Sequence, residues 1–145
     1  MKNDKTDNHE QIFWEEIDRL FPDMIKAIAS LSKKSYLSIT NLRTGITWWS
    51  ERAMDYFGMK ENYTIRSMEK ANRKIHPDDV ATFKRGFKER VDGKNLDTAW
   101  EYRIQDGDSY NRFNAMARVL YDEQKQPFII IIRYDNYGIS DEVDS

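Results

Sequence analysis

The chain has 145 residues with 23 basic and 25 acidic side chains, so its formal net charge is −2. This balance leaves no basic excess for nucleic acid, and we expect no nucleic-acid partner. Because cysteine is absent, disulfides, thiolate catalysis and Cys-ligated zinc are excluded, which fits a cytoplasmic protein. The longest apolar run, residues 128–132, is much shorter than a bilayer span, so we expect no membrane segment.

Residues 1–9 are polar and predict a disordered tail, and residues 10–33 predict a cap of amphipathic helices. Pro22 divides this cap into two helices because it removes a backbone donor. The helical pair either packs on its own domain or forms a homodimer, and the sequence leaves both open. In the second case the candidate interface residues are Phe13, Ile17, Leu20, Met24, Ile28 and Leu31.

Residues 36–40 alternate in polarity and residues 46–49 are β-branched and aromatic, which predicts two strands of one hairpin. Ser50 is placed to cap a short helix that Gly58 ends. Residues 59–75 are polar, and we expect only short helices and loops there.

The stretch "KIHPDDVATFKRGF" contains His76 beside a proline and two aspartates, which raises the question of a metal or proton-transfer site. The same residues are typical of a helix start, since Pro77 suits the first position and carboxylates are favoured in the first turn. Asp78 and Asp79 are adjacent, so on a helix they point roughly 100° apart and cannot converge on one substrate. We therefore predict a helix start, with no metal site and no catalytic residue.

Residues 98–104, 110–121 and 128–134 predict three further strands joined by hairpins, the first through an Asp-Gly turn. Strands and helices are segregated along the chain rather than alternating regularly. The predicted fold class is α+β, with a five-stranded antiparallel sheet.

This order, together with four short motifs, resembles a PAS domain of the PAS-3 type. The motifs are "WWSERAMDYFGM" (48–59), "IHPDD" (75–79), "WEYRIQDGDSY" (100–110) and "VLYDEQKQP" (119–127). The resemblance implies a PAS domain over residues 34–135, with helices on one face of the sheet. The chain departs from the family at Arg112, where a tryptophan is common, and at Lys125, where a glycine is usual.

The resemblance also implies a function, namely a cytoplasmic sensory module in bacterial signal transduction that regulates a C-terminal output domain in cis. Residues 136–145 resemble the linker into a GGDEF diguanylate cyclase, which makes cyclic di-GMP, and a two-component histidine kinase is the other output considered. One alternative is a ligand-free PAS dimerisation scaffold. A small enzyme on a cupped α+β sheet is another, but it needs a His or carboxylate in its cavity.

The cofactor is unknown from the sequence, although two are disfavoured. A cysteinyl-flavin adduct is impossible without cysteine, and a haem would need His76, which belongs to the helix start. The aromatic content of 13% fits either a plain core with a dimer face or a small-molecule cavity between sheet and helices. The candidate cavity residues are Leu37, Ile39, Trp48, Met54, Phe57, Phe83, Trp100, Tyr102, Phe113, Ala115 and Ile130.

Overall fold

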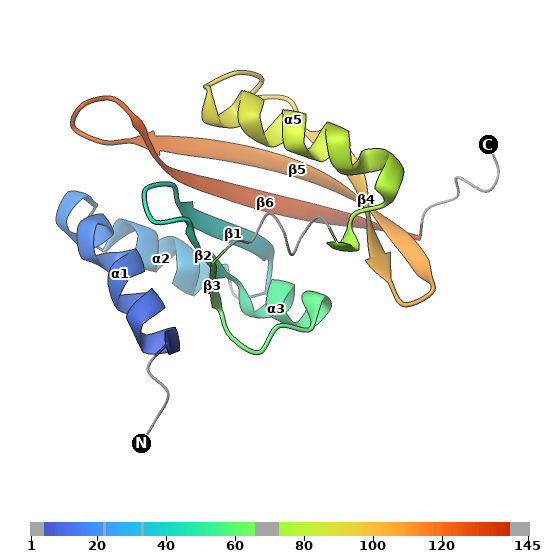
Figure 1. Cartoon of the computed structure of the whole chain (residues 1–145), viewed down its shortest axis with the longest axis horizontal. Coiled ribbons are helices and arrows are strands. Elements are labelled where there is room, and N and C mark those ends of the chain that lie inside the picture. The colour runs from blue at the N-terminus through green and yellow to red at the C-terminus, as the bar shows by residue number, and fades with distance from the viewer. Residues whose placement is uncertain (1–4, 22, 33, 66–72, 140–145) are drawn as a thin grey trace.

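The computed structural model describes residues 5–21, 23–32, 34–65 and 73–139 of the chain. Its centre is one antiparallel sheet in the order β3-β2-β1-β6-β5-β4, in which β1 and β6 join the two halves (Figure 1). The strands are β1 (Tyr36–Asn41), β2 (Ile46–Trp49), β3 (Tyr63–Ile65), β4 (Trp100–Asp106), β5 (Ser109–Tyr121) and β6 (Pro127–Ile139). The α+β class is confirmed, with six strands instead of the predicted five, because β3 is too short to show alternation in the sequence.

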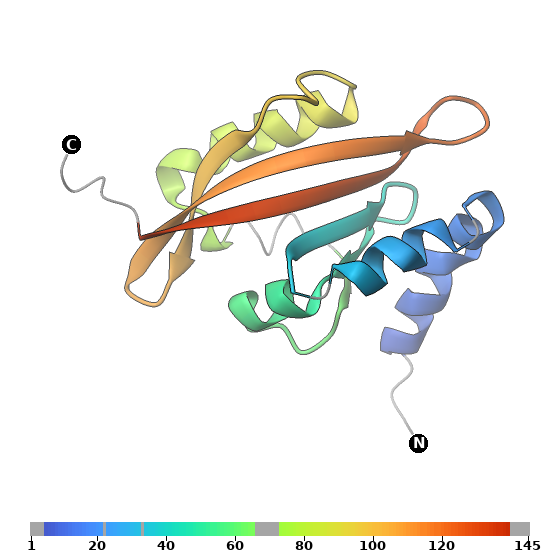
Figure 2. The ribbon, with the colours of Figure 1, turned by 180° about the vertical axis from the view of Figure 1, so that it is seen from behind.

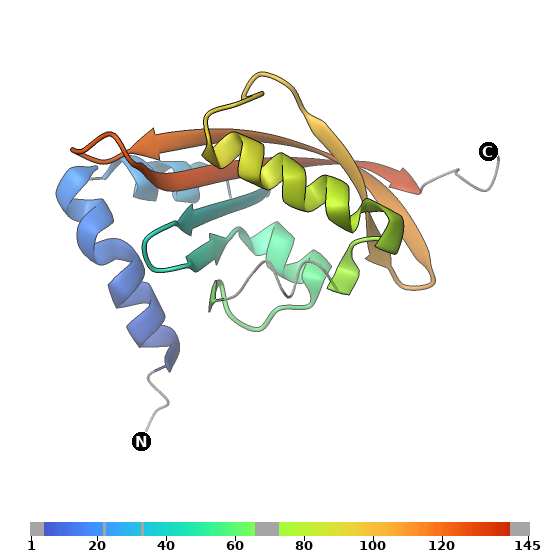
Figure 3. The same cartoon turned by 45° about the horizontal axis from the view of Figure 1, so that its top comes forward.

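Helices cover both faces of this sheet. The helices are α1 (Lys5–Leu20), α2 (Met24–Leu31), α3 (Glu51–Phe57), the short 3-10 helix η1 (Pro77–Asp79) and α5 (Val80–Val91). Helix α5 lies over β4 and β5, and Figures 2 and 3 show α2 on the opposite side of the sheet. The prediction of helices on one face therefore describes α3 and α5, whereas α1 and α2 form a second layer.

Two predicted boundaries differ from the structure. Helix α1 begins at Lys5, inside the segment predicted to be a tail, and β6 continues to Ile139, inside the predicted linker. The extension of β6 is held by pairing with β5, where Asn111 lies opposite Ile139. The remaining parts of the predicted tail and linker, and residues 66–72 of the predicted loop region, lie outside the described residues.

The predicted start and end of α3 and the predicted helix start at Pro77 are confirmed by the local structure. The Ser50 hydroxyl accepts a hydrogen bond from the Ala53 N–H at 3.3 Å, and α3 ends at Gly58 with a positive φ of 66°. His76 caps η1, since its Nδ1 accepts from the Asp78 N–H at 3.1 Å. The "HPDD" cluster is thus a helix start in the structure.

Two apolar clusters lie on opposite faces of the sheet. The inner cluster, beneath α3 and α5, consists of Trp49, Ala53, Ile75, Phe83, Trp100, Tyr102, Ile104, Phe113, Ala115, Ala117, Val119, Ile130, Ile132 and Tyr134. The outer cluster, beneath α1 and α2, consists of Phe13, Ile17, Ile25, Leu37, Ile39, Ile46, Trp48, Tyr63, Phe128 and Ile129. The sheet is therefore a shared wall between two cores.

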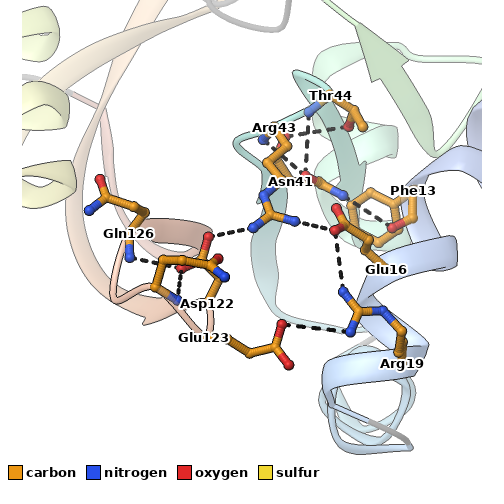
Figure 4. A network of polar contacts seen from close by, with 10 residues as sticks. Phe13, Glu16, Arg19, Asn41, Arg43, Thr44, Asp122, Glu123 and Gln126 are labelled. Atoms are coloured by element: carbon orange, nitrogen blue, oxygen red, sulfur yellow. Dashed lines mark hydrogen bonds and ion pairs between the residues drawn. The ribbon is translucent and has the colours of Figure 1, made fainter.

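Polar contacts fasten α1 to the turns at one end of the sheet (Figure 4). The Arg43 guanidinium, in the turn between β1 and β2, pairs with Glu16 of α1 and with Asp122 of the turn between β5 and β6. Arg19 extends this network, with nitrogen–oxygen distances of 3.5 Å to Glu16 and 3.7 Å to Glu123. The Arg43 hydrogen bond lowers the pKa of Glu16, so this fastening favours the ionised carboxylate.

Candidate functional site

The inner cluster brings together most of the predicted cavity residues. Phe83, Trp100, Tyr102, Phe113, Ala115 and Ile130 are members of it, and Met54 and Phe57 of α3 pack against it. The β4 and β5 members were predicted correctly because the other face of these strands carries charged side chains such as Glu101 and Arg112, which are exposed. Whether these residues line a ligand cavity stays a prediction.

The structure separates Leu37, Ile39 and Trp48 from that group, because all three belong to the outer cluster. Their placement in the same cavity was wrong, since the alternation in β1 and β2 was assigned to the wrong face. The inner side of these two strands carries Ser38 and Trp49 instead. The more apolar face of the hairpin points outward because α1 and α2 cover it.

The predicted dimer residues divide into buried and exposed sets. Phe13 and Ile17 are fully buried in the outer cluster, and Leu20 and Ile28 pack against it. The helical pair therefore packs on its own domain, and Phe13 and Ile17 are unavailable to a second chain. Of the predicted set, Met24 and Leu31 remain exposed, at 46% and 88%.

Close packing between α5 and β4 forms one wall of the inner cluster. A Cβ added to Gly86 would lie 2.7 Å from Cδ1 of Trp100, so the helix lies directly against the indole. Arg90, one turn further along α5, is only 3% exposed, and its Cζ lies 4.1 Å from the Trp100 ring centroid. Burial lowers the pKa of Arg90, and its Nη1 donates to the Gly86 carbonyl at 3.3 Å.

Three donors in this wall have no hydrogen-bond partner among the described residues: the Tyr102 hydroxyl, the Trp100 Nε1 and the Arg90 Nε. Tyr102 is 1% exposed and Trp100 is 7% exposed, with ring centroids 6.0 Å apart. Burial raises the pKa of Tyr102 well above its ordinary value, so the phenol is neutral and able to donate. An unpaired buried donor costs about 1–3 kcal/mol, so these groups need an explanation.

Two other buried aromatic donors of the inner face have hydrogen-bond partners. The Trp49 indole donates to the Thr64 hydroxyl at 2.8 Å, and the hydroxyls of Tyr134 and Ser38 share a hydrogen bond at 3.1 Å. Burial raises the pKa of Tyr134 to about 12, so it too is neutral at physiological pH. The unpaired donors are thus concentrated where α5 meets β4.

The sequence interpretation missed Arg90 and Trp49. Trp49 would have followed from reversing the alternation of β2. Arg90 carries no such signal, since a basic residue in the last turn of a helix is usually solvated and complements the helix dipole.

Among the residues the structure describes, no group of three or more His, Asp or Glu side chains could hold a metal ion. No described helix is long and apolar enough to cross a membrane.

The chain belongs to the PAS-fold family, because the family model for the PAS fold matches residues 46–132, more than half of its length. No curated protein matches the sequence.

Solved structures show the same fold in signalling proteins. A sensory box histidine kinase/response regulator from Burkholderia thailandensis is 16% identical with a TM-score of 0.59, over 77% of this chain and 83% of its own. The N-terminal domain of a diguanylate cyclase with PAS/PAC sensor from Marinobacter aquaeolei is 15% identical with a TM-score of 0.59, over 72% of this chain and 96% of its own. A PAS domain from Colwellia psychrerythraea is 18% identical with a TM-score of 0.58, over 80% and 98%.

Proposed function

We propose that this chain is a sensory input module of a signalling protein. A small ligand or a partner contact alters the inner cluster, and β6 carries the change to an output domain joined after Ser145. The observation that carries this proposal is the path of β6. Its residues Ile130, Ile132 and Tyr134 belong to the inner cluster, and the same strand then leads to Ile139 at the end of the sheet.

Tyr134 is the point where such a change would be transmitted. Its ring stacks on Trp49 with centroids 6.5 Å apart, and its hydroxyl is bonded to Ser38 of β1. A ligand that displaces an inner-cluster ring would change how β6 lies against β1. The ligand shifts the output only as far as it binds one of the two arrangements more tightly.

A diguanylate cyclase is the output we favour over a histidine kinase. Residues 136–145 resemble the linker that precedes a GGDEF domain, and one structural neighbour is the N-terminal domain of such a cyclase. In that case the module sets the production of cyclic di-GMP.

The test uses the full-length protein encoded at this locus and compares two tyrosines of β6. Tyr134→Phe removes the bond to Ser38, whereas Tyr137→Phe changes a side chain that is 64% exposed. We expect Tyr134→Phe to change the basal output activity about fivefold, the equivalent of one hydrogen bond of about 1 kcal/mol, and Tyr137→Phe to leave it unchanged. Equal output from both variants and the parent would count against the proposal.

A homodimer is the second proposal, and it would use α2. Met24 and Leu31 are exposed and seven residues apart, which places them on one face of that helix. Sedimentation should show a dimer that Leu31→Lys dissociates and Tyr137→Lys does not. A dimer that carries no small molecule in native mass spectrometry would favour the ligand-free scaffold. A monomer would exclude the homodimer and the scaffold alike.

A further inference from the structure

We propose that the outward side of the α1–α2 pair is a docking surface for a lysine-rich segment of a partner protein. The surface is an open groove of about 550 Å³ between the two helices, which lie on the opposite face of the sheet from the inner cluster (Figure 2). We call it the α1–α2 groove, and its lining residues are Glu10, Gln11, Trp14, Glu15, Asp18 and Lys26. The inference goes beyond the sensory proposal and does not depend on it.

The repeat of the helix gathers the α1 residues of the groove on one side. Glu10, Trp14 and Asp18 follow one another at intervals of four residues, so they lie along one stripe of α1. Gln11 and Glu15 repeat this spacing in the adjacent stripe. The groove is therefore a continuous acidic and aromatic strip, separate from the side of α1 that packs on the sheet.

The groove carries an excess of negative charge. It contains three carboxylates and one ammonium group, and the Asp18 carboxylate is paired within it, since Oδ2 lies 3.2 Å from the Lys26 Nζ. Glu10 and Glu15 make no ion pair with any residue that the structure describes. Two unpaired carboxylates beside a half-buried ring favour a cationic partner and disfavour an acidic one.

Lys26 shows how the groove holds a cation. Its Nζ lies 5.2 Å from the ring centroid of Trp14 while it pairs with Asp18, so one ammonium contacts a ring and a carboxylate together. The Lys26 and Asp18 side chains are 53% and 42% exposed, so the pair is solvated and weak. The Trp14 ring itself is fixed, because its Nε1 donates to the Tyr63 hydroxyl at 2.9 Å and its edge packs on Phe13. A partner's lysine can thus replace Lys26 on a preformed surface.

The length of the groove favours a segment over a single ion. Glu10 and Asp18 are eight residues apart on α1, which is about 12 Å along the helix axis. An extended chain covers that distance in about four residues. One lysine of such a segment can lie on Trp14 and Asp18 while a second lies beside Glu10 or Glu15.

A blocked peptide of four lysines is the probe, and the isotopically labelled 145-residue chain is the sample. The titration is followed by NMR at pH 7 and about 50 mM salt, where screening of exposed charges is modest. We expect saturable shifts of the Trp14 indole N–H, identified with Trp14→Phe, and of the backbone amides of residues 10–18 and Lys26. A blocked peptide of four glutamines should cause none.

Two matched pairs of variants separate the groove from general attraction between charges. Lys26→Gln removes the internal occupant and should tighten peptide binding about threefold, whereas Lys84→Gln makes the same charge change on the exposed side of α5 and should leave affinity unchanged. Glu15→Gln should weaken binding about threefold. Its control is Glu51→Gln in α3, an exposed glutamate outside the groove, which should have no effect.

Several results would overturn the inference. No saturable shift, shifts spread over the whole surface, or equal effects of Lys26→Gln and Lys84→Gln would leave no specific docking surface. Shifts of the Trp14 signals on dilution of the chain alone would show that a second copy occupies the groove. That copy would not be the proposed homodimer, because Lys26 lies about 200° around α2 from Met24. None of these results touches the sensory proposal, which fails instead when Tyr134→Phe leaves the output of the full-length protein unchanged.

Discussion

The two apolar clusters bury similar kinds of side chains but differ in whether certain aromatic donors have a hydrogen-bond partner. On the outer face, the Asn41 amide donates to the backbone of α1, and the Trp14 indole donates to the Tyr63 hydroxyl at 2.9 Å. On the inner face, the Trp100 indole and the Tyr102 hydroxyl have no partner among the described residues. Unpaired buried atoms also occur outside the inner cluster, at His9 Nδ1 and Asn114 Oδ1, so the contrast concerns the aromatic donors of the two clusters and not the faces as wholes.

The outer cluster also explains why the apolar side chains of the β1–β2 hairpin lie on the face opposite to the one that its sequence predicted. Its apolar side chains, such as Ile39, face α1 and α2, while Ser38 faces the inner cluster and bonds to Tyr134. The N-terminal helices thus belong to the core of the domain. Five predictions test how these two clusters and the contacts around them hold the fold together.

The largest effect should come from truncating a ring in either core. Phe13 and Phe113 are 0% and 1% exposed, so Phe13→Ala and Phe113→Ala should each lower the free energy of unfolding by about 3–5 kcal/mol. Urea unfolding followed by circular dichroism measures both. A loss below about 1 kcal/mol for Phe13→Ala would show that α1 is not part of the cooperative unit.

A smaller loss should follow from removing the ion pair that ties η1, directly before α5, to β4. Asp79 accepts from Nε, Nη2 and the backbone N–H of Arg103 at 2.8, 2.9 and 2.9 Å, so Asp79→Asn should cost about 2 kcal/mol at pH 7. The exposed neighbour provides the control, since Asp78→Asn should stay within about 0.5 kcal/mol.

The same pair should make stability depend on pH. Hydrogen bonds from Arg103 lower the pKa of Asp79, so its contribution is complete above the unfolded carboxyl pKa of about 3.9 and is lost as pH falls through the lower folded value. The difference between the parent and Asp79→Asn in urea unfolding should therefore shrink below about pH 4. A difference that stays constant down to pH 2 would refute this assignment.

Gly86→Ala should have a net effect of about 1 kcal/mol, because two terms oppose each other. Helix propensity alone would gain about 1 kcal/mol, whereas the new Cβ would press on Trp100 and cost about 1–3 kcal/mol. We expect a net loss in urea unfolding and a changed Trp fluorescence. A gain in stability would mean that α5 is not packed directly on β4.

The smallest effect should come from the partly exposed network that fastens α1. Arg43→Gln removes the pairing with Glu16 and Asp122, and it should lower the melting temperature at low salt. The difference should narrow in concentrated salt, because screening weakens exposed ion pairs. A control is Arg112→Gln, which breaks one isolated exposed pair with Glu101. Equal effects of both variants would show that the Arg43 network has no special role.

Much of the fold could be predicted because its signals are local. The cap at Ser50, the helix start at Pro77 and the Asp-Gly turn of the β4–β5 hairpin each depend on a few neighbouring residues. Strand β3 could not be predicted, since three residues carry no periodicity and depend on β2 for pairing. The start of α1 at Lys5 was also missed because its sequence is polar.

The candidate site was predictable only where one face of a strand is plainly polar. That condition holds for β4, so Trp100 and Tyr102 were placed on the inner side. It fails for β1 and β2, where both faces are buried and the covering helices decide which face is which. The burial of Arg90 could not be predicted from the sequence, because it depends on Trp100, a residue of a different element.

The most direct test of the unpaired donors in the inner cluster compares Tyr102→Phe with Tyr134→Phe in the free protein. The Tyr134 hydroxyl has a partner, so its removal should lower the free energy of unfolding by about 1 kcal/mol. The Tyr102 hydroxyl has none among the described residues, so its removal should leave that free energy unchanged or raise it. An equal loss for both variants would show that the Tyr102 hydroxyl already has a partner within the fold, and would contradict its place among the unpaired donors.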